Sequence, residues 1–346
     1  MKFVSKNTVL TICRTVALVA AVTLTGCFVA DWVDSEFSYS KVINPQAVPK
    51  FEIPAKIPGT RYLQFEAVGD FGTGAGGQHG VAVSMADKAS RDSISFVLVV
   101  GDNFYESGVQ SVNDEQWQSA FERMYNQPSL NVPFYAVLGN HDYRTNPQAQ
   151  VDYTKMSKRW KMPNRYFSFA QPIDDSTSVE IFCLDTNPLA YLSISEAKAL
   201  SDTGIELKQI HWLAERLGQS TARWKIVIGH HPLYSGGEHG DNETLQYLFE
   251  PLFTRYRVDF YVCGHDHDQE LLRPIHGVTY IVSGAGSKHR DVRWRENTLY
   301  AETNLGFTFF RVSRNDAVIE FLKRSGVVDY AQSFHKSDSL SNVPAH

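Results

Sequence analysis

The sequence predicts an α/β protein with a single-domain fold of two packed mixed β-sheets flanked by helices. Three observations predict this class. Short apolar runs typical of strands alternate with amphipathic stretches typical of helices from residue 62 to residue 263. The apolar runs that follow are closely spaced, as in antiparallel hairpins. Five of the runs end in a glycine and then a polar side chain, and ligands collect at such strand ends in open α/β sheets.

Each element is justified by its pattern of apolar residues. We expect early strands at residues 63–68, 96–100, 134–138, 179–184, 224–228 and 260–263. Helices are expected where apolar residues recur every three or four positions, at 81–90, 117–124, 207–217 and 245–253. Three later strands, at 278–282, 306–312 and 317–322, are expected to form antiparallel hairpins that close a second sheet. The order of elements therefore predicts one layered domain.

The first 26 residues differ from the rest and predict a secretory signal peptide. Basic side chains precede the apolar run 16–22, which is too short to be a stable membrane anchor. Leu24-Thr25-Gly26-Cys27 resembles the bacterial lipobox, in which the cysteine is lipidated; an ordinary signal peptide cleaved nearby is the alternative. We expect a signal peptide at 1–26, lipidated Cys27 and a proline-rich tether at 27–60, the main domain at 61–335 and a polar tail at 336–346.

These features predict a protein that is secreted across the inner membrane and anchored in the periplasm by the lipid on Cys27. Phe28 is not the aspartate that retains lipoproteins at the inner membrane, which favours the outer membrane. No later apolar run is long enough to span a bilayer. The net charge of −5 argues against a nucleic-acid partner held by a broad basic face. We expect a monomer that meets membranes only through its lipid.

The predicted folded part contains two cysteines, Cys183 and Cys263, each in an apolar strand. A disulfide is permitted in an oxidising periplasm. Because the sequence does not bring the two strands together, we expect two buried free thiols.

The five glycine-terminated runs deliver potential metal ligands to loops at one edge of the fold. The candidate ligands are Asp70, Asp102, Tyr105, Asn140, His230, His265 and His267. Three potential anions, one amide oxygen and three imidazoles suit two cations that share a carboxylate, and Asp102 is the expected bridge. Mixed nitrogen and oxygen ligands without thiolate favour iron, zinc or manganese. Phenolate is a hard anion, so Fe(III) is expected beside Tyr105. Such a pocket keeps a net positive charge and attracts phosphate.

Further polar residues near these runs could bind a phosphate ester and catalyse its cleavage. His141 can donate to phosphoryl oxygens, and we expect Asp142 to help orient it. His239 is a candidate acid for the departing alkoxide, and Glu238 beside it is expected to keep the imidazole protonated. His231 is expected to face away from the metals and pack.

The five blocks resemble those of the purple acid phosphatases, which belong to the calcineurin-like metallophosphoesterase superfamily. The similarity is greatest to the small, tartrate-resistant type. The blocks are Gly69-Asp70, Gly101-Asp102-Asn103-Phe104-Tyr105, Gly139-Asn140-His141-Asp142, Gly229-His230-His231-Pro232 and Gly264-His265-Asp266-His267. The resemblance implies a metallophosphoesterase fold and an acid phosphatase. Such an enzyme would hydrolyse phosphate monoesters, either small molecules or phosphoproteins, by attack of a metal-activated hydroxide.

The resemblance also implies roles for individual residues. Fe(III) would be held by Asp70, Asp102, Tyr105 and His267. A divalent ion, Fe, Zn or Mn, would be held by Asp102, Asn140, His230 and His265. Substrate would contact His141, His239 and Asn140, of which the two histidines act in catalysis.

Two other functions are compatible with the same residues. One is a phosphodiesterase or nucleotide pyrophosphatase that uses the same pair of metals. The other is a non-catalytic lipoprotein that keeps the fold and binds phosphate or metal. The complete ligand set favours an enzyme over the second of these.

Overall fold

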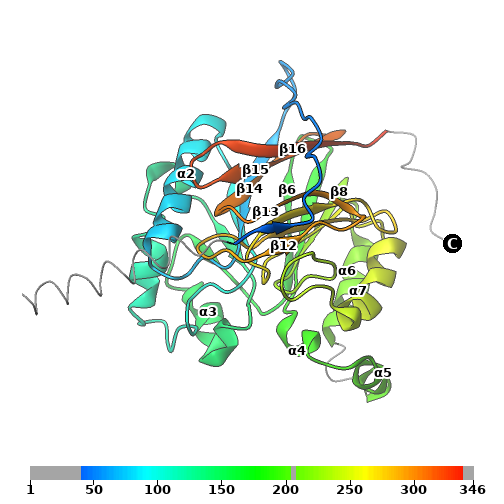
Figure 1. Cartoon of the computed structure of the whole chain (residues 1–346). Helices are drawn as coiled ribbons and strands as arrows, with labels where there is room; N and C mark the ends of the chain where they lie inside the picture. The colour runs from blue at the N-terminus through cyan, green and yellow to red at the C-terminus, as the bar shows by residue number, and fades with distance from the viewer. Residues whose placement is uncertain (1–39, 204–207, 338–346) are drawn as a thin grey trace, which may run out of the picture. The chain divides into compact units, whose positions relative to one another are not determined.

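Two seven-stranded mixed β-sheets form the framework of the protein (Figure 1). The computed structural model describes residues 40–203 and 208–337, so the predicted signal peptide, Cys27 and most of the predicted tail lie outside the described residues. The first sheet has the order β16-β15-β14-β2-β3-β4-β5, and the second has the order β13-β10-β11-β9-β8-β7-β6. Helices flank both sheets. The predicted fold class is therefore confirmed.

The central strands of each sheet run parallel and bring their carboxyl ends to the same region. In the first sheet these strands are β2 (Leu63–Val68), β3 (Phe96–Val99), β4 (Phe134–Ala136) and β5 (Trp160–Lys161). In the second they are β7 (Ser178–Cys183), β8 (Trp224–Ile228), β9 (Phe260–Cys263) and β11 (Thr279–Ser283). Loops after these strands carry the predicted ligands, because ligand sites form beyond the carboxyl ends of parallel strands.

The three late strands were predicted to close a second sheet together, but they divide between the two sheets. Of the three, β11 lies in the second sheet, but β14 (Gly306–Val312) and β15 (Asp316–Lys323) extend the first, with β16 (Val328–His335) at its edge. Stacked rings hold β14 beside β2: Phe65 stacks on Phe310 and on Phe96, each at 4.7 Å between centroids. This long-range pairing has no signal in the local sequence.

The remaining strands complete the sheet edges. They are β6 (Phe167–Pro172), which pairs antiparallel with β7, and β10 (Gln269–Leu272) with β13 (Thr298–Glu302), which form the opposite edge.

Side-chain alternation along β7 to β9 separates two cores. Ile181, Ile226 and Val262 join the main core between the sheets, whereas Phe182, Val227 and Tyr261 join a second cluster under the helices. Burial on both faces explains why these strands read as continuous apolar runs.

The helices cover the outer faces of the sheets. In Figure 1, α2 (Gly76–Asp92) and α3 (Pro147–Tyr153) lie on one flank, and α6 (Lys208–Gln219) and α7 (Glu243–Arg255) lie on the other. The short helices α4 (Asn187–Ala190) and α5 (Ile194–Thr203) precede α6. Asn242 caps α7, since its side chain accepts a hydrogen bond from the backbone of Leu245 at 2.9 Å. None of the described helices has the length and apolar character needed to cross a membrane.

The helix predicted at 117–124 is present, but it is shorter and has π-helical geometry. The segment Trp117–Glu122 is a single π-helical stretch, followed by the 3₁₀ turns Pro128–Leu130 and Asp142–Arg144 further along the chain. Trp117 stacks on Tyr153 at 3.6 Å and packs edge-on against Phe104 at 4.7 Å. These contacts bury the Trp117 ring almost completely.

Part of the predicted tether docks on the folded chain. Strand β1 (Val42–Ile43) pairs with β12 (Val292–Arg293), and Phe51 packs edge-on against Tyr330 at 5.5 Å. Cys183 and Cys263 are both buried and free, which confirms the expectation of two free thiols.

Candidate metal centre

Three of the predicted ligands sit on strained backbone directly after a glycine. Asp70, Asp102 and His265 have φ values of 56°, 51° and 70°. Residues other than glycine rarely adopt this left-handed conformation, which costs roughly 1–3 kcal/mol and occurs mainly at functional sites. The turn ends each strand sharply and directs its side chain toward the other strand ends.

Two glycines allow the ligand loops to approach one another. A Cβ atom on Gly139 would lie 2.2 Å from Oδ1 of Asp102, and one on Gly264 would lie 2.2 Å from Oδ2 of Asp70. Any larger residue at either position would collide with a carboxylate. The glycines of the sequence motifs are therefore required by close packing of one ligand loop against the next.

A first set of donors surrounds the phenol oxygen of Tyr105. This oxygen lies 3.0 Å from Oδ1 of Asp70, 3.0 Å from Oδ2 of Asp102 and 3.1 Å from Nε2 of His267. Nε2 of His267 is also 3.4 Å from Oδ1 of Asp70. Four side chains from three separate loops, which follow β2, β3 and β9, thus converge within hydrogen-bonding distance of the same phenol oxygen.

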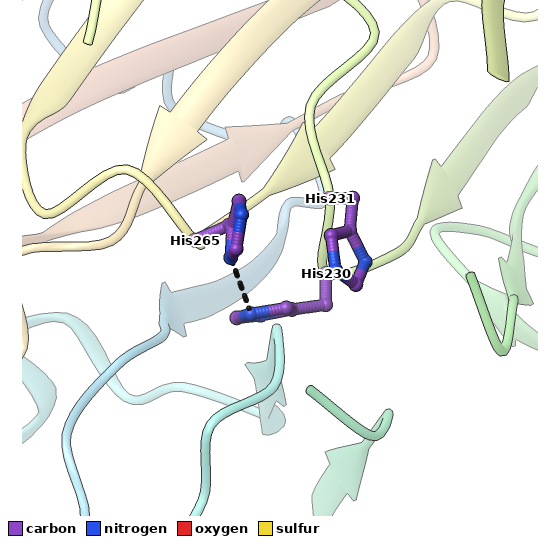
Figure 2. A group of neighbouring side chains, drawn as sticks. All are labelled: His230, His231 and His265. Atoms are coloured by element: carbon purple, nitrogen blue, oxygen red, sulfur yellow. Dashed lines mark hydrogen bonds between the residues drawn. The ribbon is translucent and has the colours of Figure 1, made fainter. Parts of the chain in front are cut away.

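A second set surrounds the amide oxygen of Asn140. This oxygen lies 3.1 Å from Nε2 of His230 and 3.0 Å from Nδ1 of His265, and these two nitrogens are 3.2 Å apart (Figure 2). Oδ1 of Asp102 lies 3.5 Å from Nε2 of His230. Asp102 therefore belongs to both sets, with Oδ2 facing the first and Oδ1 facing the second.

The chemistry of the second set fits a cation better than a hydrogen-bond network. Nδ1 of His230 lies 2.9 Å from the carbonyl oxygen of Val100, so this nitrogen carries the ring proton and Nε2 has a free lone pair. That lone pair faces acceptor oxygens of Asn140 and Asp102. Lone pairs that converge in a buried place need a positive charge between them.

The electrostatics of the protein alone point the same way. Burial, with a contribution from the nearby Asp102 carboxylate, raises the pKa of Asp70 to about 8. Burial lowers the pKa of His267 to about 3, and the charge of Arg290 adds to this effect. Burial also holds the pKa of His265 far below its usual range, and there the neighbouring imidazoles add to the effect. The site therefore disfavours protonated imidazoles and unpaired carboxylates alike, and bound cations would relieve this cost for the carboxylates.

His141 lies at the edge of both donor sets. Its backbone N–H donates to Oδ1 of Asp102 at 2.8 Å, and its Nδ1 lies 2.8 Å from the carbonyl oxygen of Glu106. Nε2 is 3.9 Å from Oδ2 of Asp102, so it points toward the centre. Burial lowers the pKa of His141. Because Nδ1 faces a carbonyl oxygen, it carries the proton of the neutral ring, so Nε2 can donate to a group bound between the two sets only when the imidazole is protonated.

The main partner of His239 is not the predicted Glu238, whose charge makes only the smallest of the named contributions that raise the pKa of His239. Nδ1 of His239 lies 2.8 Å from Oδ1 of Asp266, and this hydrogen bond raises the pKa of His239. Glu238 is mostly exposed and pairs instead with Arg290 at 3.4 Å. In the sequence Asp266 is only the residue between two predicted histidine ligands, and in the structure its carboxylate bonds to Ser235 and His239.

The predicted role of Asp142 is also wrong. Its carboxylate accepts hydrogen bonds from the backbone of Gly139 at 2.8 Å and of Asn103 at 3.1 Å, and from the side chain of Gln150 at 2.7 Å. No hydrogen bond to the His141 ring is among them. Asp142 instead joins the loop that carries Asp102 to the loop that carries Asn140, and so holds their relative position.

His231 is buried beside the second donor set, and its ring lies at 85° to that of His230 (Figure 2). Nδ1 lies 2.9 Å from the hydroxyl of Thr186, and Nε2 lies 3.2 Å from the hydroxyl of Tyr191. Both nitrogens have partners in the protein, but one ring nitrogen of His231 also lies within 4.8 Å of ring nitrogens of His230 and His265, so His231 does not face away from the second donor set as expected.

The fold and site define a class of protein. The chain belongs to the calcineurin-like phosphoesterase family, whose model matches residues 65–269. It is 34% identical over 293 residues to tartrate-resistant acid phosphatase type 5 of Homo sapiens, an alignment that covers 77% of this chain and 89% of that protein. It is 32% identical over 295 residues to purple acid phosphatase 4 of Arabidopsis thaliana, covering 80% and 83%. The resemblance to purple acid phosphatases is therefore confirmed.

Solved structures show the same fold at lower identity. GAP50 of Plasmodium, described as an anchor in the inner membrane complex, superposes with a TM-score of 0.72 at 24% identity, covering 81% of this chain and 91% of that one. The purple acid phosphatase PPD1 of yellow lupin superposes with a TM-score of 0.61 at 16% identity, covering 83% and 56%.

Proposed function

We propose that this protein is a metal-dependent acid phosphatase that hydrolyses phosphate monoesters at a centre of two metal ions. The observation that carries the proposal is the position of Asp102, whose two carboxylate oxygens face two different donor sets. A carboxylate in this position can bridge two cations. The relatives named as acid phosphatases align over nearly their whole length, which supports the same activity here.

The donors favour unlike ions in the two positions. Tyr105, with the carboxylates of Asp70 and Asp102, offers hard anionic oxygens that suit Fe(III). Asn140, His230 and His265 offer one neutral oxygen and two imidazole nitrogens, which suit a divalent ion, Fe, Zn or Mn. When bound, such a pair activates a water molecule and clamps the attacking and leaving oxygens.

The chain's own residues would orient and protonate the ester. His141, held by the carbonyl of Glu106 through Nδ1, would donate through Nε2 to a phosphoryl oxygen in its imidazolium form, which the charge of a bound phosphate would favour. His239, positioned by Asp266, would give its Nε2 proton to the departing alkoxide. Asn140 would contact substrate beside its metal. Phosphate esters of small molecules and of phosphoproteins are the substrates proposed.

Purified protein loaded with iron and zinc tests the proposal directly. We expect two ions per chain, a visible absorption band, and faster turnover of p-nitrophenyl phosphate than of its bis ester. Tyr105→Phe should abolish the band, and Asp102→Asn should lose both ions together. Faster turnover of the bis ester would favour a phosphodiesterase, and phosphate binding without turnover would favour a non-catalytic binding protein.

We also propose that the protein is a periplasmic lipoprotein anchored through Cys27 and monomeric in its working form. The support for the anchor is the lipobox-like sequence after a basic and apolar start; Cys27 lies outside the described residues. Cys27→Ser should move the protein from the membrane pellet to the soluble fraction. A variant that stays in the pellet would contradict the lipid anchor.

A further inference from the structure

Lys288 lies over the aromatic face of Tyr105. Its Nζ atom is 4.2 Å from the centroid of the ring, within the range in which an ammonium group is attracted by the π-electrons of the ring. Lys288 follows β11, whereas Tyr105 follows β3, so the two residues meet only through the packing of the two sheets. The phenol oxygen of the same tyrosine lies among the first set of donors.

The backbone around Lys288 is tied to the loops that carry predicted ligands. The hydroxyl of Ser287 donates to the carbonyl oxygen of Asp70 at 2.7 Å, and the backbone N–H of Arg290 donates to the carbonyl oxygen of His267 at 2.9 Å. The lysine therefore stands between Ser287, which is held by its hydroxyl, and Arg290, which is held by its backbone N–H. Its position over the ring is built into the loop and does not depend on the side chain alone.

Glu106 holds the ammonium group from the other side. Its Oε1 is 2.5 Å from Nζ of Lys288, and this contact lowers the pKa of Glu106. The lysine side chain is about one-third exposed, at 34%, whereas the glutamate side chain is 70% exposed. The lysine is thus a partly desolvated charge with its positive end over the ring and its counter-charge toward solvent.

We propose that Lys288 is a positioning residue that tunes Tyr105 as an iron ligand by placing a positive charge over its ring. The inference rests on the proposed function, because it concerns Tyr105 as a phenolate bound to Fe(III). A cation close to the ring stabilises negative charge there. It therefore raises the energy needed to move an electron from the phenolate to the iron. It also makes the phenolate a weaker donor, which favours the reduced state of the iron.

A second lysine in the same protein provides a matched comparison. Lys198 of α5 lies over the ring of Tyr247 of α7, with Nζ 5.4 Å from the centroid. Tyr247 is exposed and is not among the predicted ligands. Removing the charge of Lys198 therefore changes a lysine–tyrosine contact without touching the proposed centre.

The experiment compares charge variants of the iron-loaded protein by two readouts other than activity, the maximum of the visible band and the midpoint potential of the iron. Lys288→Met, which keeps the chain length and removes the charge, should move the band to longer wavelength and the potential to a more negative value. Lys288→Arg, which keeps the charge, should stay close to the parent protein. Lys198→Met should change neither quantity.

A second variant tests the sign of the effect. Glu106→Gln removes the counter-charge and leaves the lysine, so the band should move to shorter wavelength, opposite to Lys288→Met. This variant keeps the inference testable even if Lys288→Met holds iron poorly. An unchanged band and potential in Lys288→Met, or a shift of Glu106→Gln to longer wavelength, would overturn the inference. Absence of any visible band in the parent protein would instead contradict the proposed function.

Discussion

The Asp266 carboxylate accepts two hydrogen bonds from His239, one from the ring Nδ1 at 2.8 Å and one from the backbone N–H of His239 at 2.9 Å. The hydroxyl of Ser235 donates to the other carboxylate oxygen at 2.5 Å. Asp266 is buried, whereas 39% of the His239 side chain is exposed. The carboxylate thus fixes the imidazole with Nε2 directed away from the core, and it does so from the loop that carries two predicted metal ligands.

Replacing Asp266 by asparagine should shift the pH dependence of catalysis. The hydrogen bond from Asp266 raises the pKa of His239, and the proposed acid works only while it is protonated. Its protonated fraction falls as pH rises through this pKa. Asp266→Asn should lower the pKa and move the alkaline limb of the kcat profile to lower pH. Above that limb the variant should lose about 10²- to 10⁴-fold, the usual contribution of a positioned acid.

Glu238→Gln is the matched control for this change, because Glu238 is the carboxylate next to His239 in sequence and pairs with Arg290 instead. It should leave the alkaline limb nearly in place. Metal content should be measured for both variants. Equal shifts in Asp266→Asn and Glu238→Gln would show that Asp266 does not hold the imidazole protonated.

Gly139→Ala should damage the site without unfolding the protein. The new Cβ would lie 2.2 Å from Oδ1 of Asp102 and 2.3 Å from its backbone nitrogen, so the bridging carboxylate must move. A displacement of about 1 Å at a catalytic centre can cost about 10²-fold in rate. We expect a loss of that order in kcat/KM together with lower metal content, measured by elemental analysis.

Gly218→Ala in α6 is a suitable control, because its Cβ would meet nothing nearer than 3.4 Å. Alanine is the better helix former by up to about 1 kcal/mol, so this variant should be as stable as the parent or slightly more so. Full activity and metal content in Gly139→Ala would mean that the close approach of these loops is not needed.

Removal of the metals should destabilise the protein more at high pH than at low pH. In the folded protein alone, burial raises the pKa of Asp70 to about 8 from an ordinary value of 3.8. A group whose pKa is raised on folding favours the folded state below its ordinary pKa, and this contribution is lost as pH rises through the folded value. With metals bound, Asp70 stays a carboxylate and this loss does not occur.

The difference in Tm between metal-loaded and chelator-treated protein should therefore widen from about pH 4 to about pH 8. Thermal scans of both forms across this range measure it directly. A difference that stays constant with pH would be inconsistent with proton uptake by the empty carboxylates.

Local patterns were sufficient to predict much of the fold and the residues of the centre. The strands Leu63–Val68, Trp224–Ile228 and Gly306–Val312 begin and end where the apolar runs do. Burial on both faces makes such strands continuously apolar, so their limits are visible in the residues themselves. The glycine and ligand that follow a strand are adjacent in the chain, and this is why the motifs could be found without a structure.

Local patterns were misleading where packing decides the outcome. The spacing of Trp117 and Phe121 predicts a helix without revealing that it is π-helical, and Trp117 stacks there on Tyr153, which is distant in the chain. Glu238 is next to His239 in the chain, yet Asp266 holds the imidazole, because the loop after β9 brings its carboxylate within 2.8 Å of Nδ1. Sequence neighbours are not spatial neighbours in a loop, and only the fold selects between the two carboxylates.

By itself, the sequence determined the class of fold, the family resemblance and the set of side chains with the chemistry of a metal centre. These follow from residue type and spacing, which are properties of the chain. The tertiary structure alone decided how the ligands divide between the two oxygens of Asp102, which carboxylate supports His239, and which lysine lies over Tyr105. Each of these is a distance of a few ångströms between residues far apart in the chain, and such distances arise only when the two sheets pack together.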